Sequence, residues 1–170
     1  EWFDKALRTL VDIDSEWIKP GFGNALYLRP FVIATTPGVQ ASPAKDYLFI
    51  IITAPVQSYY SGDVRVKIAD YYSRAANGGF GFAKAAGNYA GQFYPTQQAA
   101  AEGYQQVMWT DDATHQYLEE AGTMNLWFRL GDTLVTCPTS ERILDGVTRK
   151  SIIAVAEKLG IKTEIRPVKV

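Results

Sequence analysis

Residues 78–90 read GGFGFAKAAGNYA, a glycine-rich stretch with one lysine, Lys84, near its centre. The neighbours of Lys84 are small, apolar or aromatic, and no acidic residue lies between Asp70 and Glu102. An amine that is kept away from carboxylates in a poorly hydrated setting loses its proton more readily. A neutral lysine amine is a nucleophile that can form a Schiff base with a carbonyl group. An exposed lysine in a glycine-rich loop explains the same composition, so both interpretations stay open at this point.

The bulk properties describe a globular chain. It has 170 residues, of which 47% are hydrophobic and 21% charged, which is enough for one ordinary domain with a core. The net charge of −1 argues against nucleic-acid binding through a basic surface. The longest apolar runs, such as residues 48–52, suit a buried strand and are too short to span a bilayer.

Cysteine and histidine are rare. The single cysteine, Cys137, rules out an internal disulfide and is typical of a reducing compartment. The single histidine, His115, has no cysteine or paired acid at metal-ligand spacing, so the sequence predicts no metal site.

Strands and helices are mixed without a strict βαβ rhythm, which predicts an α+β fold with a sheet-rich core and a few flanking helices. Helices are expected over residues 1–17, from an N-cap at Thr96 to about residue 106, and over residues 146–159, where Gly160 ends the helix. Residues 77–90 are expected to form a loop. The expected strands cover residues 25–34, 46–54, 64–69, 107–110, 117–120, 126–130, 133–137 and 161–166.

Three further segments place chemically useful residues together. Tyr27 and Arg29 alternate along an expected strand and share one face, where the guanidinium could bind a carboxylate. Glu119 and Glu120 are adjacent on another strand and point to opposite faces, so only one can enter a given site. Val147 opens an expected helix, whose N-terminus presents free N–H groups and a positive dipole end to an anion.

In their order along the chain, these segments resemble the branched-chain amino acid aminotransferases, which are fold-type IV pyridoxal-phosphate enzymes. The resemblance runs from about Leu26 to the end of the chain and rests on YLRP at 27–30, KAAGNY at 84–89, EEAGTMN at 119–125 and LDGV at 144–147. It implies a pseudo-barrel sheet core with a few flanking helices, like the large domain of that fold type.

The resemblance also implies roles for individual residues. Lys84 would bind pyridoxal phosphate covalently and move the substrate proton, while Glu120 would keep the ring nitrogen protonated so that the ring acts as an electron sink. Tyr89 would lie near the phenolic oxygen of the cofactor or near the substrate carboxylate. Arg149 either joins the phosphate site or points to solvent. The remaining implied contacts are Val147 and Thr148 with the phosphate, Arg74 in support on the phosphate side, Tyr27, Arg29 and Thr123 on the substrate side, and Val39 and Ala41 over the apolar pocket of the partner subunit.

The implied activity is amino transfer between branched-chain L-amino acids and 2-oxoglutarate, by a cytoplasmic homodimer. Residues 1–45 would be the end of a small domain and the interdomain linker, and residues 46–170 a large cofactor-binding domain that is incomplete at its C-terminus. The chain is therefore expected to be a fragment, which could be inactive alone. Alternatives are a D-amino acid aminotransferase, an aminodeoxychorismate lyase, or a folded fragment without catalysis.

Overall fold

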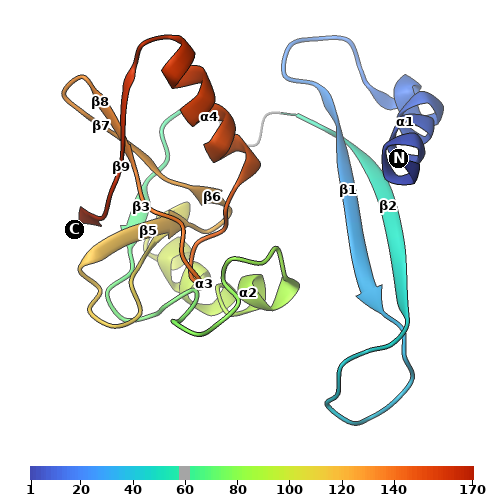
Figure 1. The fold of residues 1–170 in the computed structure, drawn as a ribbon, viewed down its shortest axis with the longest axis horizontal. Helices are drawn as coiled ribbons and strands as arrows, with labels where there is room; N and C mark the ends of the chain where they lie inside the picture. Colours follow the sequence, from blue (N-terminus) through green and yellow to red (C-terminus); the bar gives the residue numbers. More distant parts are fainter. Residues whose placement is uncertain (58–61) are drawn as a thin grey trace. The chain divides into compact units, whose positions relative to one another are not determined.

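The computed structural model describes residues 1–57 and 62–170, which form two compact units, Glu1–Gly62 and Asp63–Val170 (Figure 1). Each unit mixes helix and strand, so the predicted α+β class is confirmed. Within the described ranges, no helix has the length and the apolar character that crossing a membrane requires.

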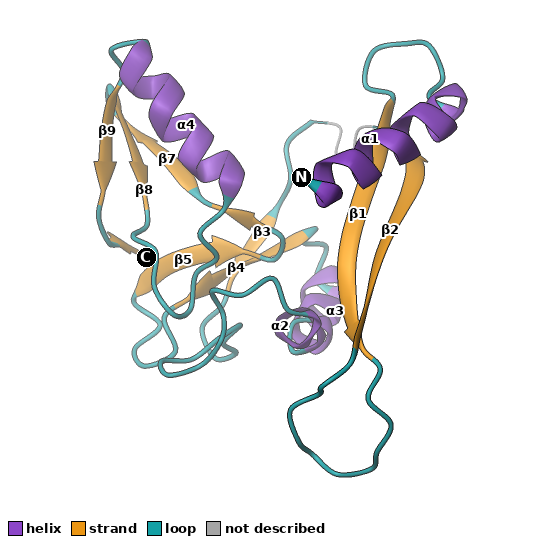
Figure 2. Cartoon of the chain, turned by 45° about the vertical axis from the view of Figure 1, so that its right-hand side comes forward, coloured by secondary structure: helices purple, strands orange, loops and turns teal. Residues whose placement is uncertain are grey.

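The first unit is a helix packed on a two-stranded hairpin (Figure 2). Helix α1 (Trp2–Asp14) runs into a 3₁₀ turn (Ser15–Trp17) and is followed by the antiparallel strands β1 (Ala25–Ala34) and β2 (Tyr47–Val56). The rings of Trp2 and Phe3 pack against Phe49 of β2, with centroids 5.2 and 5.8 Å apart. At the other end of α1, the hydroxyl of Thr53 donates a hydrogen bond to Asp14.

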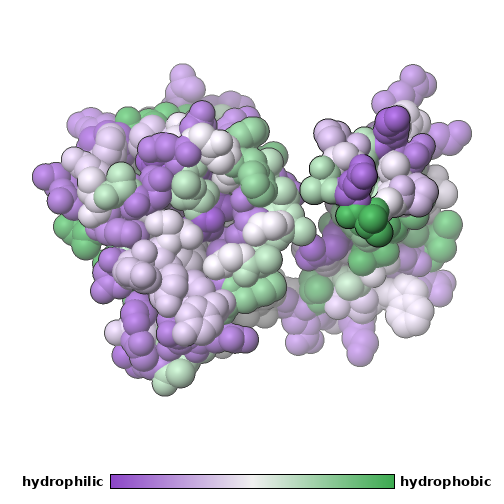
Figure 3. Space-filling model, turned by 90° about the horizontal axis from the view of Figure 1, so that it is seen from below, coloured by the Kyte–Doolittle hydropathy of each residue, from purple (hydrophilic) through white to green (hydrophobic). Residues whose placement is uncertain are grey.

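This packing is thin, because none of the side chains of residues 1–57 is fully buried. Large apolar side chains, including Trp17, Ile33 and Ile52, are exposed, and Figure 3 shows hydrophobic residues on the surface of this unit. The unit ends after β2, whereas the sequence places a domain boundary at residue 45. The two strands stay together because β2 pairs with β1 over its whole length, and the assignment of whole domains stays a prediction.

The second unit contains two sheets and three helices. One sheet has the strand order β10 (Val168–Lys169), β5 (Tyr117–Ala121), β4 (Gln106–Thr110) and β3 (Val66–Ile68), and β6 (Met124–Asn125) pairs with the end of β5. The other has the order β7 (Trp127–Leu130), β8 (Thr133–Thr136) and β9 (Lys162–Ile165). The helices are α2 (Ala86–Ala90), α3 (Phe93–Ala101) and α4 (Val147–Lys158).

Two clusters of buried side chains form the core of this unit. One gathers Leu118, Val135, Cys137, Ile143 and Val168, and the other gathers Ala69, Ala99, Val107 and Trp109. Strand β5 is buried from Leu118 to Ala121, on both of its faces. Since successive side chains of a strand point to opposite faces, the acidic pair at its centre is enclosed on both sides.

Two expectations about helices are wrong. Thr96 is not an N-cap, because α3 already begins at Phe93 and the backbone N–H of Thr96 donates within the helix to Gln92 O. The expected loop of residues 77–90 ends in the short helix α2. The side chain of Asn88 in this helix donates to the carbonyls of Phe80 and Ala83, which folds the preceding chain onto it.

Candidate functional site

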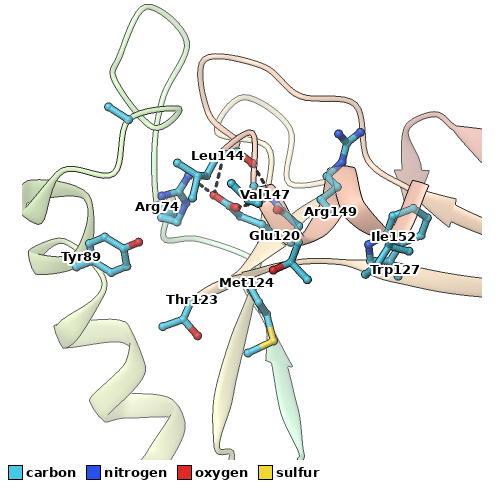
Figure 4. Close-up of a pocket in the computed structure, with 16 residues that line it drawn as sticks. Arg74, Tyr89, Glu120, Thr123, Met124, Trp127, Leu144, Val147, Arg149 and Ile152 are labelled. Atoms are coloured by element: carbon cyan, nitrogen blue, oxygen red, sulfur yellow. Dashed lines mark hydrogen bonds and ion pairs between the residues drawn. The ribbon is translucent and has the colours of Figure 1, made fainter. Parts of the chain in front are cut away.

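A pocket of about 300 Å³ opens in the second unit, at the low end of the volumes of small-molecule sites. Its walls come mainly from residues 120–125, at the end of β5 and the turn into β6, and from residues 146–149, at the start of α4 (Figure 4). Arg74, Ala83, Tyr89 of α2, Trp127, Leu144 and Ile152 complete the lining. Segments that are far apart in the sequence therefore converge on one cavity.

Glu120 lies at the buried base of this pocket. Glu120 is only 4% exposed, and its carboxylate forms an ion pair with Arg74. The same carboxylate accepts hydrogen bonds from Leu144 N at 3.4 Å and from Asn125 Nδ2 at 3.2 Å. Burial outweighs the attraction of Arg74 and raises the pKa of Glu120 to about 7. The neighbouring Glu119 pairs instead with Arg142, at 2.6 Å.

Arg74 lines the pocket, where its guanidinium lies against Glu120 and also donates to the carbonyls of Gly81 and Arg142. Arg74 therefore holds the buried carboxylate and the glycine-rich stretch together. The support on the phosphate side that the resemblance implies stays a prediction.

Lys84 pairs with Tyr89, which lines the pocket, but Lys84 itself is not among the lining residues. The amine of Lys84 donates a hydrogen bond to the hydroxyl of Tyr89 and lies 4.6 Å from the centre of its ring. The expectation of a poorly hydrated lysine is wrong for this chain, because Lys84 is exposed. Composition could not predict this exposure, because the apolar neighbours of Lys84 in sequence are mostly too small to cover its side chain. Its charge acts on Glu120, where it lowers the pKa against the larger effect of burial.

The N-terminus of α4 forms another wall. Gly146 is the N-cap residue, and no side chain in the described parts of the chain caps the helix, which leaves the first N–H groups, at Val147 and Thr148, for another partner. Arg149 is buried, so it does not point to solvent. Its Nη2 donates to Cys137 O at 3.0 Å, and its Nε has no hydrogen-bond partner among the residues that the structure describes.

Replacing Gly146 with alanine should loosen the pocket. A Cβ at this position would overlap Oδ1 of Asn125, whose amide is held by Glu120 and by Leu144 O at 2.8 Å. We expect Gly146→Ala to lower the free energy of unfolding by about 1–3 kcal/mol, since buried hydrogen bonds are lost. Urea denaturation measures this change.

Gly91→Ala is the matched control, because a Cβ on Gly91 meets no atom within 4 Å. It should change the free energy of unfolding by less than about 0.5 kcal/mol. Equal stability of the Gly146→Ala and Gly91→Ala variants would show that Asn125 is not fixed in this way.

The remaining candidates divide between the two units. Thr123 lies in the turn between β5 and β6 and lines the pocket. Tyr27 and Arg29 belong to the first unit, where they share a face of β1: Nη2 of Arg29 donates to the hydroxyl of Tyr27 at 3.0 Å. Val39 and Ala41 lie in the exposed connection between β1 and β2.

Residues 3–170 match the family model described as amino-transferase class IV. The chain is 44% identical over 161 residues to branched-chain-amino-acid transaminase 1 of Bacillus subtilis, covering 92% of this chain and 45% of the relative. It is 41% identical over 170 residues to a probable branched-chain-amino-acid aminotransferase of Staphylococcus aureus, covering 98% and 48%. The chain thus spans about half the length of these relatives.

Solved structures show the same similarity. A branched-chain amino acid aminotransferase from Escherichia coli superposes with a TM-score of 0.71 at 26% identity, covering 84% of this chain and 49% of that one. An aminotransferase from Brucella abortus, solved with the cofactor PLP, gives a TM-score of 0.80 over 98% of this chain and 59% of its own. At 19% identity, this second match supports the fold alone.

Proposed function

We propose that this chain, which belongs to the class IV aminotransferases, holds pyridoxal phosphate and forms part of a branched-chain amino acid aminotransferase. The observation that carries this proposal is one pocket that is lined by a buried carboxylate, an uncapped helix N-terminus and Tyr89, the tyrosine to which the amine of Lys84 donates a hydrogen bond. The relatives at 40–44% identity are named for branched-chain substrates, which disfavours a D-amino acid aminotransferase or an aminodeoxychorismate lyase.

The pocket fits a ligand with a cationic ring nitrogen and an anionic phosphate. Glu120 supplies a buried carboxylate for the first, and the N-terminus of α4 supplies free N–H groups for the second. Two residues that line the pocket, Arg149 and Trp127, each carry a buried donor, Nε and Nε1, that lacks a partner within the described part of the chain. Such orphaned donors normally signal a missing partner.

Each residue then has a defined task. Bound pyridoxal phosphate supplies an electron sink for the negative charge that develops at the Cα of the amino acid. Glu120 would face the ring nitrogen and keep it protonated, and Val147 and Thr148 would hold the phosphate. The amine of Lys84 would hold the cofactor and move the proton at the substrate Cα, and the hydroxyl of Tyr89 would orient that amine.

The substrate and assembly parts of the proposal rest on the resemblance and on the names of the relatives. Thr123, Tyr27 and Arg29 would bind substrate carboxylates. Val39 and Ala41 would cover the apolar pocket of a partner subunit in a cytoplasmic homodimer, with branched-chain amino acids and 2-oxo acids as substrates. The short side chains of Val39 and Ala41 suit an apolar contact.

Adding pyridoxal phosphate to the intact protein should produce a bound-cofactor absorbance band, and the loaded protein should transfer the amino group of leucine to 2-oxoglutarate. Borohydride reduction should fix the cofactor on the peptide that contains Lys84. A protein that shows no band and no fixed cofactor would contradict the cofactor site. Turnover of D-alanine in preference to leucine would contradict the substrate class.

A further inference from the structure

The glycine-rich stretch before Lys84 is held from outside by residues 141 and 142. The backbone N–H of Gly78 donates to the carboxylate of Glu141 at 2.7 Å, and that of Phe82 donates to the carbonyl of Glu141 at 3.0 Å. Gly81 packs so closely that a Cβ there would come within 2.9 Å of the backbone of Arg142. The residues that lead to Lys84 therefore lie directly on this short segment.

The side chain of Arg142 ties the same segment to the back of β5. Its Nε donates to Glu119 Oε1 at 2.6 Å, and its Nη1 lies 3.5 Å from Asp112 Oδ1. Nη1 also donates to Asn77, the residue at the start of the glycine-rich stretch. The side chains of Arg142, Glu119 and Asp112 are 18%, 9% and 19% exposed, so solvent screens this network only weakly.

The two acids of β5 thus have matching arginines on opposite faces. Glu120 pairs with Arg74 on the pocket side, and Glu119 pairs with Arg142 on the other. The two arginines are themselves connected, because Arg74 donates to the backbone carbonyl of Arg142. A displacement of Arg142 would therefore change contacts of both the strand that carries Glu120 and the stretch that leads to Lys84.

We propose that Arg142 is a positioning residue that locks the glycine-rich stretch, residues 77–83, to Glu119 on the back of β5 and so fixes Lys84 relative to Glu120. Arg142 acts through its neighbours and does not line the pocket. Its guanidinium fork reaches Glu119 and Asn77 at once, which the single ammonium of a lysine does not do in a fixed geometry.

The first test follows backbone hydrogen exchange of the intact protein without cofactor. Arg142→Gln should speed exchange in residues 77–83 about tenfold, as expected when roughly 1.4 kcal/mol of local stability is lost, and leave α4 unchanged. Glu119→Gln should have the same effect, and the double variant should add nothing further, because both changes break one connection. Wild-type exchange in Arg142→Gln, exchange that rises equally in α4, or additive effects would each overturn the proposal.

The second test rests on the proposed function. Measured per bound pyridoxal phosphate, kcat for leucine should fall about 10²-fold in Arg142→Gln, as for a misplaced reacting group, while KM stays nearly constant. An unchanged kcat in a variant that binds cofactor normally would overturn the link to Lys84. If the wild-type protein does not bind cofactor, the proposed function fails, and the exchange experiment still decides whether Arg142 locks the stretch.

Arg166→Gln is the matched control for both experiments. It removes an arginine from the ion pair with Glu164, at 3.0 Å, in which both side chains are substantially exposed and neither touches the glycine-rich stretch. Exchange in residues 77–83 and kcat should both match the wild-type protein, which separates loss of the Arg142 network from loss of an arginine charge.

Discussion

Lys84→Ala should abolish covalent retention of pyridoxal phosphate and lower amino transfer by at least about 10²–10⁴-fold, the contribution of a positioned acid–base group. The amine removed is the one that both attaches the cofactor and carries the substrate proton in the proposed site. The fold should persist, because Lys84 is exposed and, among the residues that the structure describes, its side chain hydrogen-bonds and stacks only with Tyr89. Borohydride reduction followed by peptide mass analysis reads out attachment, and leucine turnover reads out transfer.

Lys158→Ala is the control, since Lys158 is an exposed lysine in the last turn of α4. It should retain the cofactor adduct and full turnover. A Lys84→Ala variant that still carries the reduced cofactor would assign the attachment to another amine and remove the basis of the proposed mechanism.

Without added cofactor, the free energy of unfolding should fall as pH rises from about 4.5 to about 7, because of Glu120. Burial raises the pKa of Glu120 from 4.5 to about 7, so the folded chain binds more protons than the unfolded chain in this window. Stability is therefore highest below the lower pKa and is lost through the upper one, by about 3 kcal/mol in all. Urea denaturation across this range measures the slope.

Glu120→Gln should flatten most of this slope, and the pKa of Glu119, which burial also raises, leaves a smaller remainder. The same variant should lower amino transfer by about 10²–10³-fold, as when a preorganised electrostatic group is removed. Glu157→Gln, an exposed change on α4, should keep both the slope and the activity. A wild-type slope in Glu120→Gln would show that Glu120 is not the group that titrates.

Local patterns were sufficient where the relevant neighbours are close in sequence. Strand alternation correctly separated Glu119 from Glu120, and the start of α4 followed from Gly146 and the helical residues after it. Each of these inferences depends on the geometry of a single element or of one short segment. The pairing of Lys84 with Tyr89 was not predicted, although the two residues lie within the same six-residue motif.

Contacts between residues that are far apart in the sequence could not be predicted from these local patterns. Nothing near Arg74 in the sequence indicates that it pairs with Glu120, and Arg142 reads as an ordinary loop residue until Glu119, Asp112 and Asn77 converge on it. Asn88, which holds the glycine-rich stretch, differs from these two arginines because it lies within the KAAGNY motif and could have been singled out from the sequence. A five-residue helix that contains Gly87 and is followed directly by Gly91 has too weak an intrinsic propensity to be predicted.

Residues 1–57 contain no fully buried side chain, so this unit should tolerate few destabilising mutations and should unfold readily on heating. A helix on a two-stranded hairpin retains little independent stability. The candidate residues for substrate choice, Tyr27 and Arg29, lie on this weakly packed unit, whereas the candidate cofactor residues lie on the well-packed one. Mutation or mild heat should therefore alter which amino acid is accepted well before the cofactor is lost.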